Sequence, residues 1–265
     1  QRGALPSADD IDVLIIGMGG VGGMIVPRLT NAGLKVVALE AGEWRNPRQY
    51  VPDELGLSFY GRAGLGDKFN RELARWRLDD VSKNREAIYG YGKMVNGVGG
   101  SIAHYGAWLR RYHPHHFRMR SHIVDRWGEK AIPHHSTVAD WCISYDELEP
   151  YYTEIEYLVG VAGNGEDNPF IPRSKSLPLP PLRDFRLGER YKDVTRSMGY
   201  HPYMVPAGQN SIPYDGRPAM KYHPWGVGFG MMTADRWEPA KTTIPQALST
   251  GNLDLRTGCR VVRIV

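Results

Sequence analysis

Three glycines, Gly17, Gly19 and Gly22, follow a short apolar run, and Gly20 lies among them. Between a strand and a helix, the first such glycine permits a tight turn, the second lets the backbone approach a diphosphate, and the third lets the helix pack on the strand. The free N–H groups at the helix start, with its positive dipole end, can hold the phosphate charge. The spacing therefore predicts a dinucleotide-binding loop. A glycine-rich turn without a ligand is the alternative.

Glu40 is the acidic residue that such a loop requires, because it ends the next apolar run. Its carboxylate can accept hydrogen bonds from both hydroxyl groups of an adenosine ribose. The same negative charge would repel a 2′-phosphate, so NADP is disfavoured at this site. NAD and FAD both remain open on these residues alone.

The surrounding sequence supplies the elements that must position these groups. Residues 12–16 are apolar and β-branched, as in a parallel strand buried on both faces. Residues 23–33 predict a helix that Gly33 ends, and residues 35–40 predict a second strand. This order predicts an α/β fold with a Rossmann-like dinucleotide-binding domain.

A second glycine segment, residues 91–105, bears on the choice of cofactor. It contains Asn96, the pair Gly99 and Gly100, and then His104 and Tyr105. Glycines here suit a backbone that passes close to a flat ring or a phosphate, although a tight turn without a ligand is again the alternative. The segment resembles the second flavin-contacting segment of the glucose–methanol–choline (GMC) oxidoreductase family. It is most similar to the branch that contains pyranose oxidase and the sugar-acid and fructose dehydrogenases.

The resemblance implies FAD as the cofactor and a glutathione-reductase-like FAD domain that is incomplete in this chain. It also implies that the five residues named in that segment contact the cofactor. In pyranose oxidase-like members the histidine matching His104 is bonded to the 8α-methyl carbon of the flavin, which implies a covalent link here. Two alternatives stay open: a neutral histidine beside the dimethylbenzene ring, and a hydrogen-bonded histidine in the core.

Two further stretches agree with the resemblance and imply the domain limits. Residues 141–152 resemble the segment that opens the family's substrate-side region. Residues 240–242 and 251–264 resemble its return into the FAD domain, where Val261 is expected to contact the cofactor. We therefore expect a first FAD-binding part over 9–135, an inserted substrate-side region over 136–221, and a return segment over 222–265.

Metal centres are not expected on this chain. Some sugar-oxidising relatives hold an iron–sulfur cluster before the Ala-Lys motif, but residues 226–237 contain no cysteine, and a cluster needs several thiolates. Electron transfer to O₂ or to a soluble or small-molecule acceptor is favoured instead. The histidine-rich stretch 113–116 lacks the spacing of a zinc motif, and Pro114 interrupts it.

The catalytic base is expected beyond Val265. Members of the resembled family are about twice as long, and their base is a histidine near the far C-terminus, paired with a second histidine or an asparagine. We therefore expect a second chain that carries the C-terminal half. The oligomeric state stays open, a homo-oligomer included.

The expected reaction is oxidation of a CH–OH group by hydride transfer to flavin N5, with a sugar, glycoside, polyol or sugar acid as substrate. A non-sugar alcohol oxidase and a catalytically silent flavin-binding subunit are the alternatives. The net charge of +4, from 33 basic and 29 acidic residues without a basic block, gives no sign of nucleic-acid binding. No apolar run reaches the roughly 18 residues of a membrane span. The compartment, cytoplasmic or secreted, stays open.

Overall fold

The computed structural model describes residues 10–46, 75–77, 81–83, 85–86, 95–222 and 233–264. The chain forms two compact units: unit 1 comprises residues 1–106 and 222–265, and unit 2 comprises residues 107–221. The return to unit 1 at residue 222 coincides with the expected start of the return segment, whereas the limit expected at 135/136 falls inside unit 2. Compactness does not report contacts with cofactor or substrate, so the functional assignment of these segments stays a prediction.

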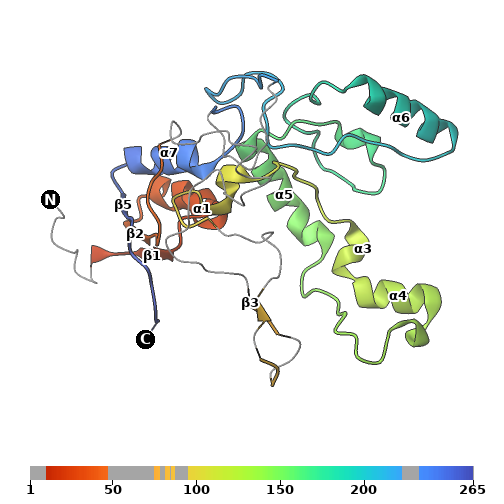
Figure 1. Cartoon of the computed structure of the whole chain (residues 1–265), viewed down its shortest axis with the longest axis horizontal. Helices are drawn as coiled ribbons and strands as arrows, with labels where there is room; N and C mark the ends of the chain where they lie inside the picture. Colours follow the sequence, from red (N-terminus) through yellow and green to blue (C-terminus); the bar gives the residue numbers. More distant parts are fainter. Residues whose placement is uncertain are drawn as a thin grey trace. The chain divides into compact units, whose positions relative to one another are not determined.

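Unit 1 is built on a three-stranded parallel sheet (Figure 1). Strands β1 (Val13–Ile16) and β2 (Val36–Leu39) are adjacent and joined by helix α1 (Gly20–Asn31). Strand β5 (Leu253–Arg256) pairs with the other edge of β2. This β1–α1–β2 arrangement is Rossmann-like, so the predicted fold class and both predicted strands are confirmed. Gly33, with φ +84°, follows the end of α1 as predicted.

The core of unit 1 lies between this sheet and the helices α1 and α7 (Thr243–Ser249), which lie side by side in Figure 1. Val26 of α1 and Ile244 of α7 are fully buried together with Ala38 of β2. Leu14 and Ile16 of β1 are instead 54% and 49% exposed. The prediction that the first strand is buried on both faces is therefore wrong for this chain, because β1 is covered on one face only.

Short elements complete unit 1. Two 3₁₀ helices, η3 (Gly100–His104) and η7 (Pro239–Lys241), flank the amino end of α1, and strands β3 (Arg75–Trp76) and β4 (Arg85–Glu86) form an antiparallel pair. Among the described residues, no helix is long and apolar enough to cross a membrane.

Unit 2 is organised around helix α5 (Tyr145–Val159). Ser144 caps its amino end in a capping box with Glu147, and Gly160 ends it in the left-handed conformation. Phe117, Tyr145 and Ile171 form a small core beside it. The remaining elements of the unit are α3 (Pro114–Phe117), α4 (Met119–Trp127), η4 (Glu129–Ala131), η5 (Gly165–Asp167) and α6 (Arg186–Ser197).

Candidate functional site

The turn from β1 into α1 is held by an unusually close approach of two glycines. Gly17 has φ +89°, a conformation that side chains other than glycine rarely adopt. A Cβ atom at Gly22 would lie only 2.3 Å from the carbonyl oxygen of Gly17, so the helix can start this close to the strand only without that atom. The first α1 hydrogen bond runs from Gly23 N–H to Gly19 O at 2.9 Å. The preceding N–H groups of the first turn have no partner within the helix and point out of its end.

Glu40 is buried at the mouth of this turn, 7% exposed. Its Oε2 accepts a hydrogen bond from Met18 N–H at 2.9 Å, and its Oε1 accepts one from Gly42 N–H at 2.8 Å. These two bonds fix the carboxylate beside the glycine loop. Each carboxylate oxygen can accept more than one hydrogen bond, so both remain able to receive ribose hydroxyls.

The second glycine segment packs directly on the first. Gly99 N–H donates to Met18 O at 2.8 Å, and the Cα atoms of Gly19 and Gly100 come so close that a Cβ at Gly100 would lie 3.0 Å from Gly19 Cα. Gly99 and Gly100 both have positive φ, +91° and +56°. The structure thus brings together two glycine motifs that are far apart in the sequence. Residues 91–94 of the second motif lie outside the described residues.

Asn96 contributes its backbone to the same place. A Cβ at Gly42 would lie 2.2 Å from the carbonyl carbon of Asn96, so residues 42 and 96 touch through their main chains. An isolated parallel bridge between Glu43 and Gly97 continues this contact. The end of β2, with Glu40, is therefore tied to the second glycine segment.

His104 and Tyr105 follow at the end of η3, both partly buried. The Tyr105 hydroxyl donates to Trp237 O at 2.8 Å, and Arg236 Nη1 donates to Tyr105 O at 2.8 Å. Burial lowers the pKa of Arg236, although Tyr105 and Asp235 act in the opposite direction. These contacts fix the backbone beside His104. No pattern in the sequence predicted that residues 236 and 237 would anchor this segment.

Glu238 is a further buried residue that sequence reasoning missed. It is 1% exposed, and its Oε2 lies 2.5 Å from Lys241 Nζ. A Cβ at Gly99 would lie 3.6 Å from Glu238 Oε1, and a Cβ at Gly23 would lie 2.4 Å from Pro239 Cβ. The segment before α7 therefore closes over both glycine motifs. The spacing of Glu238 and Lys241 by three residues was the signal available in the sequence.

Val261 lies in the partly buried chain that follows β5. Close by, Cys259 N–H donates to Glu40 O at 2.8 Å and Gly258 N–H donates to Gly42 O at 3.2 Å. The return segment thus runs along the end of β2. All the predicted cofactor residues of this chain lie in unit 1, on segments joined by these contacts, but their role as ligands stays a prediction.

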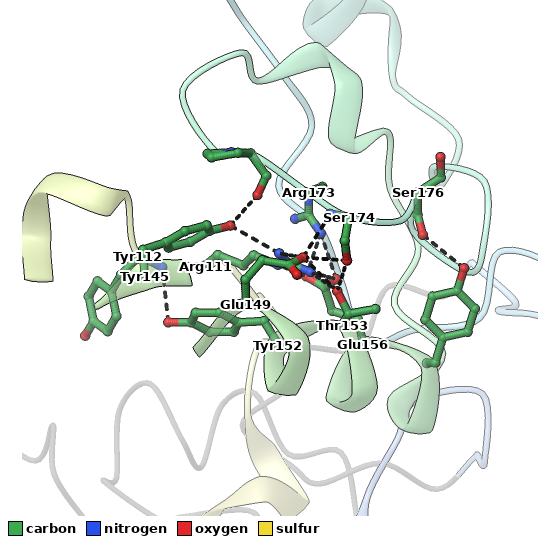
Figure 2. Close-up of polar contacts among 12 residues, drawn as sticks. Arg111, Tyr112, Tyr145, Glu149, Tyr152, Thr153, Glu156, Arg173, Ser174 and Ser176 are labelled. Carbon is green, nitrogen blue, oxygen red and sulfur yellow. Dashed lines mark hydrogen bonds and ion pairs between the residues drawn. The ribbon is translucent and has the colours of Figure 1, made fainter. Parts of the chain in front are cut away.

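Unit 2 contains a buried ionic network that no local sequence pattern indicated (Figure 2). Arg111 Nε and Nη2 donate to the two carboxylate oxygens of Glu156 at 2.9 and 2.7 Å, and Arg111 Nη1 donates to Glu149 at 2.8 Å. Arg173 Nη1 also bonds both oxygens of Glu156, at 2.8 and 2.7 Å. The four charges balance, and Thr153 and Tyr145 receive the remaining Arg111 N–H bonds.

Hydrogen bonding controls the protonation of this network. Burial by itself would lower the pKa of Arg111, but the bonds to Glu156, Glu149 and Tyr145 raise it above its ordinary value. Burial would likewise raise the pKa of Glu149, but Ser174 N–H and the Arg111 guanidinium outweigh it and lower that pKa to about 2. Both groups are therefore charged at neutral pH. The arrangement positions helix α5 and the loop that follows it.

The histidine-rich stretch forms a ring cluster on α3 and α4. The rings of His115 and His116 are 4.3 Å apart, His115 stacks on His122 at 5.1 Å, and His113 N–H donates to His116 Nδ1 at 2.9 Å. Burial, followed by the neighbouring histidines, lowers the pKa of His113, His115 and His116. Within the part of the chain that the structure describes, no group of three or more His, Cys, Asp or Glu side chains could hold a metal ion.

No protein-family model matches the chain. It is 26% identical over 279 aligned residues to the gluconate 2-dehydrogenase flavoprotein of Pantoea cypripedii, covering 96% of this chain and 45% of that protein. It is 31% identical to the 2-methyl-1,2-propanediol dehydrogenase of Mycolicibacterium austroafricanum, covering 97% and 44%.

The large subunit of fructose dehydrogenase from Gluconobacter japonicus is also 31% identical, over 78% of this chain and 38% of that protein. The chain thus spans less than half the length of these relatives. Among solved structures, a pyridoxine 4-oxidase from Mesorbium loti aligns over 94% of this chain and 42% of its own, with 18% identity and a TM-score of 0.48.

Proposed function

We propose that this chain is a GMC oxidoreductase of the sugar-acid branch and that it binds FAD where β1, β2 and the two glycine motifs meet. One observation supports this proposal above the others: the Gly17–Gly22 turn, the carboxylate of Glu40 and the second glycine segment lie in contact with one another. Bound FAD would supply a two-electron acceptor for a CH–OH group.

The residues present fit that cofactor. The α1 amino end offers unpaired N–H groups and a positive dipole end to the diphosphate, and Gly19 presents no side chain toward it. Glu40 would receive the ribose hydroxyls, and the backbones of Asn96, Gly99 and Gly100 would border the flavin side. Val261 and Tyr105 would lie along the return segment and the end of η3, respectively.

We propose a hydroxyl-bearing small molecule as substrate, in the class of sugars, glycosides, polyols and sugar acids. Support comes from relatives named for gluconate, fructose and paromamine, which share a carbon that carries a hydroxyl group. The relative named for 2-methyl-1,2-propanediol favours a second candidate, a simple aliphatic alcohol. We further propose that the general base, which takes the hydroxyl proton as hydride leaves the carbon, is supplied by polypeptide outside this sequence or by a partner chain.

Flavin tethering through His104 is a finer proposal. His104 ends η3, and the next residue, Tyr105, is hydrogen-bonded to Trp237 and Arg236. These bonds hold the backbone at His104 in place, which supports the proposal. A covalent bond to the 8α carbon would keep the cofactor attached after unfolding. The purified protein is denatured and precipitated, and yellow colour in the pellet, lost in His104→Ala, supports the tether. A colourless pellet from the parent protein rejects it.

Flavin binding and substrate oxidation are tested separately. The chain is titrated with FAD while the flavin fluorescence is followed, with NADP as the control ligand that Glu40 should exclude. Anaerobic bleaching of bound flavin is then measured with gluconate, fructose, sorbitol and 2-methyl-1,2-propanediol, with and without the C-terminal half of a relative. Absence of saturable FAD binding would overturn the cofactor proposal. Bleaching by this chain alone would overturn the proposal that the base lies elsewhere.

A further inference from the structure

Four histidines of unit 2 lie in ring contact with one another on two short helices. His113 precedes α3, His115 and His116 lie on it, and His122 lies on α4. The ring centroids of His113 and His116 are 5.5 Å apart, those of His115 and His116 are 4.3 Å apart, and His115 stacks on His122 at 5.1 Å. We call these four residues the histidine cluster. It shares no residue with the proposed flavin site.

One ring of the cluster caps α3 in a way that depends on its protonation. His116 Nδ1 accepts a hydrogen bond from His113 N–H at 2.9 Å, which is half of the capping box at the amino end of this helix. A ring nitrogen accepts only while it carries no proton, and both ring nitrogens of an imidazolium are donors. Protonation of His116 therefore breaks this bond and sets two N–H groups against each other.

Repulsion between the rings adds to this effect. Imidazolium ions this close to one another disfavour each other's charged form. Among the described residues, no carboxylate bonds or pairs with any of the four rings, and Asp125, three residues after His122 on α4, forms no ion pair with it. No acidic partner in this part of the chain therefore compensates the charge that the cluster acquires in acid.

The groups around the cluster are cationic, neutral or already paired. Arg118 pairs with Asp140, Arg120 pairs with Glu129, Tyr112 contacts the His116 ring, and Tyr145 of α5 contacts the Phe117 ring. Burial, followed by the neighbouring histidines, lowers the pKa of the three histidines at α3, so the folded chain favours the neutral rings. The stability that they contribute is complete above the ordinary histidine pKa of about 6.5 and is lost as the pH falls below it.

The cap is connected to the core of unit 2 through Phe117. This side chain is 1% exposed and packs with Tyr145 and Ile171. The carbonyl oxygen of Phe117 accepts a hydrogen bond from Trp141 N–H at 2.9 Å, so α3 is tied to the segment that leads into α5. We propose that the histidine cluster makes α3 and α4 a pH-responsive element, which neutral imidazoles keep ordered and mildly acidic solution loosens. The proposal does not depend on flavin or substrate.

Two NMR measurements on the full chain test this between about pH 7.5 and pH 5. The ring signals of His116 give its protonation midpoint. Hydrogen exchange at Trp141 N–H, corrected for the intrinsic pH dependence of exchange, reports whether its bond to Phe117 O persists. We expect a midpoint below about 6.5 and roughly a tenfold loss of Trp141 protection across it, as for a lost cap. A higher midpoint, or protection that is independent of pH, would overturn the proposal.

His116→Asn is the diagnostic variant, because asparagine Oδ1 can accept the same bond from His113 N–H but does not titrate. Its Trp141 protection should match that of the parent protein at neutral pH and should not fall with His116's midpoint in acid. His134→Asn makes the same change at an exposed position after η4 and should keep the full pH response. Equal acid loss of protection in the two variants would contradict the role of the cap.

His115→Asn tests the repulsion separately, because it removes one charge and leaves the cap in place. The protonation midpoint of His113 should then rise, since His115 is the neighbour that lowers the pKa of His113. An unchanged midpoint would mean that the rings do not act on one another. This measurement needs only the parent protein and one variant, so it decides the matter even if His116→Asn folds poorly.

Discussion

Replacing Gly22 by alanine should destabilise the protein whether or not a cofactor binds. The added Cβ would lie 2.3 Å from Gly17 O, where ordinary contacts begin at 3.4 Å, so helix and strand must separate by about an ångström. Overpacking of this kind costs about 1 to 3 kcal/mol. For a protein of this size we expect the melting temperature of the FAD-free form to fall by about 2 to 12 °C.

Gly19→Ala is the matched comparison, because it adds the same atom one turn earlier in the loop. Gly19 has φ −82°, which alanine adopts freely, and the nearest atom to its Cβ would be Gly100 Cα at 3.9 Å. The FAD-free stability should therefore change by less than about 0.5 kcal/mol. The same methyl group would occupy the approach of the diphosphate, so FAD affinity should fall about tenfold or more.

Calorimetry of the FAD-free proteins gives the melting temperature of each variant, and FAD titration followed by fluorescence gives its FAD affinity. We expect a loss of stability for Gly22→Ala and a loss of FAD affinity for Gly19→Ala. If Gly19→Ala binds FAD as tightly as the parent protein, the loop does not hold the diphosphate. If Gly22→Ala melts at the same temperature as the parent protein, Gly22 does not lie as close to Gly17 O as described.

Three more outcomes can be measured. The pKa of Glu149 is about 2 in the folded protein and near 4.5 when unfolded. Its ionisation therefore contributes at most about 3 kcal/mol to the free energy of unfolding, in full above about pH 5 and progressively less as the pH falls toward 2. Urea unfolding measured across this pH range should show the decrease, and Glu149→Gln should lack it. Arg111→Met should cost about 3 to 5 kcal/mol because it leaves Glu149 buried without its arginine partner and Glu156 with Arg173 alone, and an unchanged urea unfolding midpoint would contradict this. Glu40→Gln should weaken FAD binding and also lower stability by about 1 kcal/mol, since one of two backbone N–H groups loses its acceptor; unchanged FAD affinity would argue against a ribose contact.

The sequence was sufficient to predict those elements of unit 1 whose structure depends on neighbouring residues. Residues 12–40 carry their own periodicity, glycine spacing and terminal acid, and these alone predicted β1, α1 and β2. Gly17 and Gly22 were interpreted correctly because their roles depend on a turn a few residues long. The contact of Gly19 with Gly100 was not predicted, since no local pattern relates two loops so far apart.

Long-range contacts explain what the sequence could not predict. Arg111 meets Glu149, Glu156 and Arg173 across separations that leave no periodic trace, so the network was missed. The grouping of residues 107–135 with unit 2 likewise depends on distant contacts, because Gly208 N–H donates to Ala107 O at 2.8 Å. Exposure of Leu14 and Ile16 depends on what covers the sheet, and the residues of β1 themselves carry no information about that.

The strand order β1–β2–β5 has a consequence for synthesis on the ribosome. Residues 40–252 must be added after β2 before β5 can pair with its open edge, which takes about 10 to 40 s at roughly 5 to 20 residues per second. Unit 2 lies wholly within that interval and is complete before the sheet is. The edge of the nascent β2 that later pairs with β5 therefore lacks that partner throughout this interval. The topology of this chain thus determines how long that edge needs protection from pairing with other chains.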